Sequence, residues 1–358
     1  MQFSSAKGFV VSVSEVAPAG TRSCALNQVA VRFRACAGQS SCYPMTRRQW
    51  RVPVKALRCA AAILLVLAGN TATAKGAQRC DSACLENIGN HYLRAYLGHY
   101  PKLAPMGANI RFTENNVPMK LPDGSWDAVT GQLAEALVFS DPTTGNVGIY
   151  TAVSMNDTPA FLAIRLRVAG GNIVEAEHLL STKRLVSGPP TPFGDPTKFR
   201  HDPEMARLLA PSERRSRPEL IRIADGYFQT LSRNDGTLHT NFSDKCHRLE
   251  NGMETAADGC ATGFRQGRFR FNERVRRTEV LVDEARGLVM ARGFIDHKGT
   301  VDHYQLTDGT DRRSPFREPH TWSFIETFKI SNGAITSVEA DFIGSPYRSP
   351  SPWGAAIE

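Results

Sequence analysis

The chain has 358 residues, of which 41% are hydrophobic and 22% are charged, a composition typical of folded proteins rather than disordered ones. The formal net charge of +8 comes from the first 74 residues, which hold nine bases and a single acid, so bases and acids are equal in number in the remainder. No basic stripe with interleaved aromatic residues occurs, which argues against a nucleic-acid-binding protein.

The basic leader has the three parts of a secretory signal peptide over residues 45–74. A positive region with Arg47, Arg48, Arg51 and Lys55 precedes a short apolar stretch at residues 60–68, and Ala72-Thr73-Ala74 forms a small-x-small cleavage site. The apolar stretch is too short for a comfortable membrane span, and an uncleaved anchor is the alternative. We expect residues 1–44 to be a non-structural extension or a mis-called start. The mature protein would begin near Lys75 and be periplasmic or secreted, with no stable membrane span after processing.

Four of the eight cysteines lie beyond the leader. An even number in an exported chain indicates disulfides, although spacing alone does not fix their connectivity. A bond between Cys246 and Cys260 would stabilise the second half by about 3 kcal/mol through loop closure. Cys80 and Cys84 could bridge if Cys80 lies just before a helix. Zinc is the rival interpretation, but no finger spacing, HExxH motif or tight Asp cluster occurs, so we expect no metal.

Hydrophobic periodicity and turn residues divide the rest of the chain into short elements. In the first half we expect a helix at 80–100, a strand at 109–121, a Trp-bearing turn at 123–127, strands at 147–155 and 160–168, and a hairpin at 167–180. A Pro-rich linker with one helical turn follows at 188–216. In the second half we expect a helix at 217–235, a strand at 246–255, hairpins at 274–297 and 320–343, and a polar hairpin extension at 296–315.

Three features recur in the same order in both halves. They are a tyrosine on the first helix, a Glu followed by an Asn-containing turn, and a Glu in the last hairpin. The corresponding pairs are Tyr92 with Tyr227, "TENN" (113–116) with "LENG" (249–252), and Glu177 with Glu339. We therefore predict one α+β unit written twice, with domains at 75–187 and 217–358.

A helix followed by a curved antiparallel sheet resembles the SnoaL-like, or nuclear-transport-factor-2-like (NTF2-like), cone fold over residues 80–185 and 217–345. The segments "CDSACLE", "RFTENN" and "SPYRSPSPW" also resemble an uncharacterised tandem family of bacterial and fungal proteins of the DUF8021 type. The resemblance implies two tandem cone domains of the α+β class, each a curved antiparallel sheet wrapped on helices around an apolar pocket. Relatives of this fold include isomerases, cyclases, dehydratases and lyases, while others only bind a ligand or a partner.

A carboxylate or imidazole held in such a pocket can transfer a proton near neutral pH. Glu114 shares a strand face with Phe112, so an inward Phe112 places Glu114 at the pocket mouth. Glu250 carries the same argument and is slightly favoured as the base, because His247 and Arg248 lie beside it. A solvent-exposed Glu114 and a purely structural ion pair between Arg248 and Glu250 are the alternatives.

Further residues are candidates for binding a substrate or for packing. Glu177 and Glu339 alternate with apolar neighbours, and a solvated face is favoured for both; Asp341 shares the face of Glu339 and could titrate with it. The candidate substrate-binding residues are His91, Tyr92, Arg111, Trp126, Tyr227, Arg248 and Trp322. The tryptophans could equally be packing residues, and Tyr92 a core residue.

No GxSxG, GxGxxG or P-loop motif occurs, so neither a nucleotide nor a redox cofactor is indicated and we expect no cofactor. The fold resemblance implies an exported, cofactor-independent isomerase, dehydratase or lyase that acts by proton transfer on a small apolar or aromatic molecule. The alternative is a non-catalytic exported module that binds a ligand or another chain, and a homodimer remains open.

Overall fold

In the computed structural model, residues 80–184 and 188–354 are described. They belong to the compact unit from Thr73 to Glu358, to which all that follows refers. The extension at 1–44 and the leader at 45–74 lie outside the described residues. Within the described ranges, no helix is both long and apolar enough to cross a membrane.

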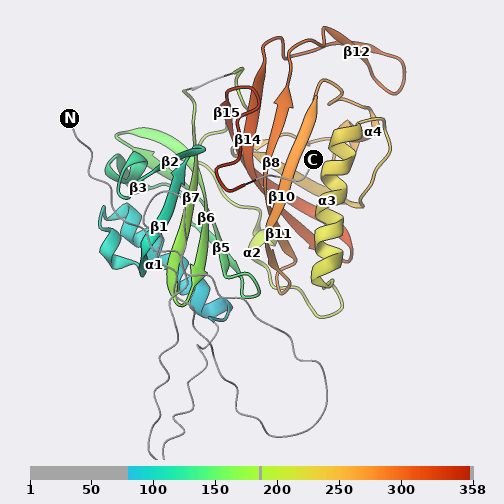
Figure 1. Ribbon diagram of the computed structural model, residues 1–358. Coiled ribbons are helices and arrows are strands. Elements are labelled where there is room, and N and C mark those ends of the chain that lie inside the picture. The colour runs from blue at the N-terminus through green and yellow to red at the C-terminus, as the bar shows by residue number, and fades with distance from the viewer. Residues whose placement is uncertain (1–79, 185–187, 355–358) are drawn as a thin grey trace, which may run out of the picture. The chain divides into compact units, whose positions relative to one another are not determined.

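The first half, residues 80–184, consists of one long helix and a seven-stranded sheet (Figure 1). Its sheet has the order β2-β1-β7-β6-β5-β3, with β4 paired to β5; β1 and β7 are parallel and the other pairs antiparallel. The Asp81 carboxylate caps the helix by accepting from the Cys84 amide. The elements are α1 (Ser82–Leu97), η1 (Pro101–Leu103), β1 (Met106–Glu114), β2 (Val117–Met119), η2 (Gly124–Asp127), β3 (Val129–Gln132), β4 (Leu137–Asp141), β5 (Asn146–Met155), β6 (Thr158–Ala169) and β7 (Asn172–Thr182).

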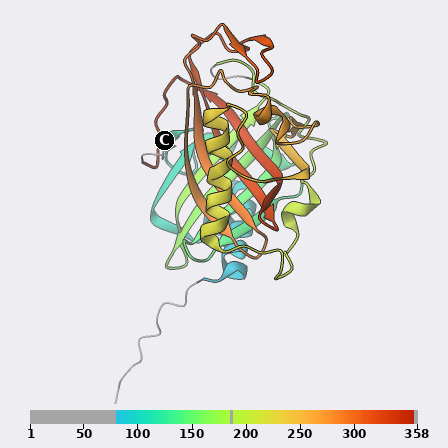
Figure 2. The ribbon, with the colours of Figure 1, turned by 90° about the vertical axis from the view of Figure 1, so that its right-hand side faces the viewer.

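The second half has a six-stranded sheet of order β10-β11-β14-β15-β8-β9, in which β8 and β15 are parallel. Figure 2 shows α3 running along one face of this sheet. The elements are α2 (Pro203–Ala206), α3 (Arg217–Arg233), β8 (Phe242–Glu250), β9 (Met253–Glu254), α4 (Thr262–Arg265), β10 (Arg274–Asp283), β11 (Leu288–His297), β12 (His303–Gln305), β13 (Asp311–Arg313), β14 (His320–Ser331) and β15 (Ala334–Ser345). The α+β class is as expected. β3, β4 and α4 were not predicted, because short strands and single helical turns carry little periodicity.

A matched turn ends the parallel strand of each half. The expected strands at 109–121 and 246–255 are interrupted there, because Asn115 and Asn251 adopt left-handed conformations with φ of 49° and 44°. The Asn115 side chain accepts from the Leu180 amide and donates to its carbonyl, and Asn251 makes the same two bonds with Phe342. The recurrence of "TENN" and "LENG" therefore marks a turn that ties the parallel strand to the last strand of its sheet.

Asn251→Ala is expected to lower the free energy of unfolding by about 2 kcal/mol, because it leaves buried backbone groups of Phe342 unpaired and puts alanine, which has no polar side chain to bond locally, in a left-handed conformation. Asn156→Ala is the matched control: Asn156 has the same φ of 44° but is exposed, and it should cost about 1 kcal/mol. Urea unfolding of both variants measures the difference, and equal losses would contradict the role of the side-chain bonds.

The faces of the two sheets that are turned away from α1 and α3 pack against each other. Apolar residues from both sheets form one buried cluster, in which Tyr150 and Leu179 of the first half meet Met290 and Ile325 of the second. The Thr327 hydroxyl donates to the Tyr150 hydroxyl across this interface at 3.1 Å. The central strands β5, β6, β11 and β14 are therefore buried on both faces, although the face toward the other sheet also carries polar residues such as Thr327.

Two carboxylates lie inside this interface. Glu177 is 1% exposed and pairs with Arg165 at 3.1 Å and with Arg292 of the other half at 2.8 Å. Glu339 is 2% exposed and lies 2.6 Å from His201 Nδ1. The solvated face expected for Glu177 and Glu339 is therefore wrong: the opposite half and the connecting segment cover these carboxylates, and their partners are distant in sequence.

Asp341 shares the buried face of Glu339, as its spacing predicts. Burial raises the pKa of Asp341 well above its ordinary value, and the charge of Glu339 raises it further. Its Oδ2 atom has no hydrogen-bond partner within the described ranges. Burial therefore favours the neutral form of the Asp341 carboxyl group.

The Pro-rich segment at 188–216 contains α2, the single helical turn expected there. Met205 is fully buried in the cluster between the sheets. His201 contacts the Glu135 carbonyl of the first half at 3.2 Å as well as Glu339 of the second. The segment is thus packed along both halves and is not a free tether.

Both expected disulfides are present. Cys80 and Cys84 join the residues at the start of α1, with their Cα atoms 5.3 Å apart. Cys246 on β8 is bonded to Cys260 just before α4, with their Cα atoms 5.6 Å apart. Disulfides of this kind are typical of proteins in oxidising compartments.

Candidate functional site

The inward-facing side chains of the first half fill the space between α1 and its sheet. Trp126, on η2, stands edge-on to Tyr92 and Tyr96, with ring centroids 5.5 and 5.3 Å apart. The Tyr92 hydroxyl lies 2.9 Å from His178 Nε2. All four side chains are fully buried, so this interior consists of packed aromatic rings.

Glu114 closes this network at the end of β1. It accepts hydrogen bonds from the amide and the hydroxyl of Ser125, and its Oε2 lies 3.4 Å from His178 Nδ1. Burial acts to raise the pKa of Glu114, but His178 and Ser125 together bring it below its ordinary value. Glu114 is thus an ionised acceptor whose partners belong to the protein.

The second half encloses a cavity of about 300 Å³, at the small end of the range for ligand sites. Its walls come from α3, β8, β14 and the loop around α4. Most of the lining is apolar, and its charged or acidic side chains are Arg248, Glu250, Asp258, Arg268 and Glu326. The apolar walls include Tyr227, Leu231, Phe269, Phe271, Trp322 and Phe342.

Strand register explains why this interior has room that the first lacks. On the parallel strand pair of the first half, Glu114 stands opposite His178, whose imidazole fills the centre. At the matched place of the second half, Glu250 stands opposite Ala340. A methyl group in place of an imidazole leaves space beside the carboxylate, and the cavity lies there.

Glu326 is the most perturbed acid of the cavity. It is 2% exposed, and its Oε1 atom has no hydrogen-bond partner among the described residues. Burial and the nearby charge of Glu250 raise the pKa of Glu326 to about 8, against smaller opposing effects of Arg248 and Tyr227. Glu326 is therefore mostly protonated at neutral pH and can donate a proton or a hydrogen bond.

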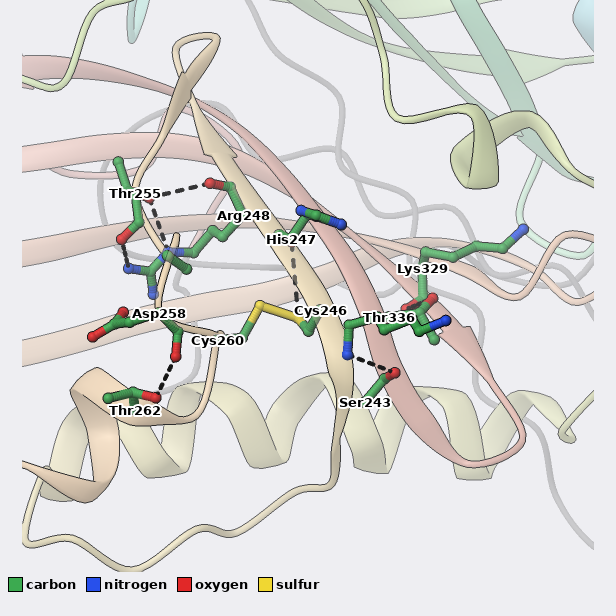
Figure 3. The surroundings of a disulfide bond; sticks show 12 residues. Ser243, Cys246, His247, Arg248, Thr255, Asp258, Cys260, Thr262, Lys329 and Thr336 are labelled. Carbon is green, nitrogen blue, oxygen red and sulfur yellow. Dashed lines mark hydrogen bonds between the residues drawn. A yellow bond between two sulfur atoms is a disulfide. The ribbon is translucent and has the colours of Figure 1, made fainter.

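Arg248 holds the second acid. Its Nε lies 3.4 Å from Glu250 Oε1, and the guanidinium donates to the hydroxyl and the carbonyl of Thr255 at 3.0 and 3.1 Å (Figure 3). This pairing places a positive charge beside the Glu250 carboxyl group. Burial, with the charge of Glu326, raises the pKa of Tyr227 well above its ordinary value, so its phenol keeps its proton.

The residues expected from sequence to form a site divide into two groups. Glu250, Tyr227, Arg248 and Trp322 line the cavity. His247 does not: its side chain is 63% exposed and lies 3.6 Å from Glu254. Strand alternation accounts for this, since His247 points away from the face that carries Arg248 and Glu250.

The other expected residues lie in the first half. Glu114, Tyr92 and Trp126 belong to its packed interior. His91 is half-buried on α1, next to Tyr92. Arg111 is exposed, and its guanidinium covers the Trp353 ring at 4.5 Å and donates to the Pro352 carbonyl, so it fastens the C-terminal tail.

Glu326 was missed by the sequence analysis, although a signal was present. Every second residue of β14, from Trp322 through Phe324 and Phe328 to Ile330, faces the core of the second half. Glu326 occupies the middle of that apolar series. A single carboxyl within an otherwise apolar strand face indicates either a paired buried charge or a site.

In the parts of the chain that the structure describes, no group of three or more His, Cys, Asp or Glu side chains is arranged to hold a metal ion.

Residues 213–342, most of the second half, match the model of a family described as a domain of unknown function, DUF8021. The expected resemblance is thereby confirmed for this half. Comparison with curated proteins finds no match.

Several solved structures resemble about a third of the chain. A candidate ketosteroid isomerase from Kribbella flavida is 11% identical, with 35% of this chain and 93% of that one covered and a TM-score of 0.26. AclR, a candidate hydroxylase from Streptomyces galilaeus, is 13% identical over 37% and 83%, with a TM-score of 0.26. An NTF2-like protein of unknown function from Cytophaga hutchinsonii is 13% identical over 35% and 97%, with a TM-score of 0.21.

Proposed function

We propose that the second half binds a small, largely apolar or aromatic molecule in its cavity and transfers a proton on it without a cofactor. The observation that carries the proposal is Glu326, a buried carboxyl with a raised pKa and an unpartnered oxygen beside the ion-paired Glu250. A protonated carboxyl group next to a second carboxyl group that faces a guanidinium provides an acid and a base for acid–base catalysis.

The roles follow from this arrangement. Glu250, beside the Arg248 guanidinium, accepts a proton from a carbon next to a carbonyl group, and the electron pair of the broken C–H bond moves toward the carbonyl oxygen. The phenol of Tyr227 and the protonated Glu326 donate hydrogen bonds to that oxygen as it becomes negative. Glu250 then returns the proton to another carbon, which gives an isomer. If Glu326 instead protonates a departing hydroxyl, water leaves and the reaction is a dehydration.

We also propose that the halves are two copies of one NTF2-like cone with divided roles. The corresponding strand orders and the shared turn at Asn115 and Asn251 support a common unit. The first interior is packed around Trp126, which favours a supporting role, whereas the second is open. In this proposal the first half braces the sheet that carries Glu326.

Export is the remaining part of the proposal, supported by the two disulfides and by the signal-like leader. Mass spectrometry of the protein from its native host is expected to show a mature chain beginning near Lys75. A dominant cytosolic species that retains Met1 would contradict it.

The proposed reaction is tested by incubating the protein with small aromatic and alicyclic carbonyl compounds in D₂O. Exchange of the hydrogen next to the carbonyl is followed by NMR, since enolisation by Glu250 must exchange this hydrogen with solvent. Compounds that bind without exchange would favour the non-catalytic ligand-binding alternative, and a protein that neither binds nor exchanges any of them would contradict the proposed ligand class.

A further inference from the structure

The wall of the cavity next to β8 is a stretch of chain with little secondary structure of its own. Residues 255–263, here called the wall segment, run from the end of β9 into α4. They contribute six lining residues: Thr255, Ala256, Asp258, Gly259, Cys260 and Gly263. Gly259 has a φ of 92°, and no strand pairs with the segment. Its position must therefore be fixed by other contacts.

The wall segment is held at three places. At its start, Thr255 is bonded to the main chain and the side chain of Arg248. At its end, Phe264 is fully buried, with its ring 5.2 Å from that of Tyr227. In between, the Cys246–Cys260 disulfide is the covalent tie to β8 (Figure 3), and Asp258 is ion-paired with Arg268 at 2.7 Å.

β8 carries both the tie and the chemistry. Cys246, Arg248 and Glu250 alternate along one face of the strand, so the disulfide, the guanidinium and the proposed base all point the same way. Cys260 itself lines the cavity. The bond therefore sets the distance between the wall segment and the face that presents Glu250.

We propose that the Cys246–Cys260 disulfide positions the wall of the cavity, so that the second half takes its ligand only when this bond is oxidised. The inference rests on the proposed function, in that the ligand occupies this cavity. In the reduced protein the wall segment keeps its end contacts and the Asp258–Arg268 ion pair but loses its tie to β8, and the cavity loses its fixed shape. The site is thereby completed only in a compartment where disulfides form.

The test compares two paired alanine variants. Cys246→Ala/Cys260→Ala removes the bond while keeping small apolar side chains in the core, and Cys80→Ala/Cys84→Ala removes the bond at α1 as the matched control. Binding of N-phenyl-1-naphthylamine, a neutral aromatic probe, is measured by fluorescence, and backbone amide exchange by mass spectrometry. The first variant is expected to bind at least tenfold more weakly, with faster exchange confined to the wall segment, while the control matches the wild type.

The other results distinguish failure of this proposal from failure of the ligand-site proposal on which it rests. If the Cys246→Ala/Cys260→Ala variant binds the probe as tightly as the wild type, or exchanges no faster in the wall segment, the bond does not position the wall. If that variant fails to fold, the bond serves the whole half and not the wall. If the wild type itself does not bind the probe, the ligand-site proposal loses its support, and the exchange measurement alone decides the role of the disulfide.

Discussion

Glu250→Gln is expected to lower kcat/KM for enolisation by about 10²–10⁴-fold while leaving ligand binding nearly unchanged. The substitution keeps the shape and the hydrogen-bonding capacity of the side chain, but an amide cannot accept the proton, and removal of a general base typically costs this much. The measurement is the rate of solvent deuterium exchange, together with probe affinity, for the wild type and the variant.

Glu114→Gln is the matched control, because Glu114 occupies the same place on the parallel strand of the first half. Its carboxylate is engaged by Ser125 and His178, so the variant should lose stability but retain its exchange rate per folded molecule. Unchanged exchange in Glu250→Gln would contradict the assignment of the base. Equal loss in both variants would point to a structural effect common to the two halves.

The residues of the site that could be predicted from sequence are those whose placement depends only on their neighbours in the chain. Glu250 and Arg248 were found because alternation along a strand places residues two apart on one face, and Tyr227 because it stands in a helix that repeats Tyr92. The turn at Asn251 was visible as a repeated motif. These features depend on a few neighbouring residues, so the sequence contains them directly.

The remainder depends on contacts between distant segments. The sequence neighbours of Glu177 do not indicate its ion pair with Arg292, which lies on the other sheet. Those of Glu339 do not indicate its contact with His201. Strand alternation shows which residues share a face of the sheet, but it does not show whether that face is in contact with solvent. Only the packing of the two sheets shows that both faces are buried at Glu177 and Glu339. Whether a cone is open also depends on opposite residues, since Ala340 and His178 decide it from another strand.

Glu326→Gln is expected to stabilise the protein, and by an amount that depends on pH. In the folded state burial and the charge of Glu250 raise the pKa of Glu326 from its ordinary 4.5 to about 8. Between pH 4.5 and about pH 8, Glu326 keeps its proton in the folded protein but has released it in the unfolded chain. The free energy of unfolding therefore declines as the pH rises from 4.5 to about 8. The cost is about 3 kcal/mol at pH 7, from the 1.36 kcal/mol of each pKa unit.

Urea unfolding at a series of pH values measures the difference between Glu326→Gln and the wild type. It should be near zero at pH 4, grow as the pH rises, and level off above about pH 8. Glu177→Gln is the control of opposite sign: although burial opposes them, Arg292 and Arg165 lower the pKa of Glu177. That variant should be less stable than the wild type at neutral pH, with the deficit shrinking in acid. A gain in Glu326→Gln that is equal at pH 4 and pH 8 would contradict the raised pKa.

The ionisation of Glu326 should also appear in the pH dependence of the exchange reaction. Proton or hydrogen-bond donation by Glu326 is lost as it ionises, so kcat/KM for exchange in the wild type should fall as the pH rises through about 8, and Glu326→Gln should lack this limb.

At the matched register position the first half has Ile164, an apolar residue that costs no desolvation. A strand that could hold an isoleucine there instead keeps a carboxyl that weakens the fold at neutral pH. Such a cost is expected where a side chain serves the chemistry of the cavity and not its stability.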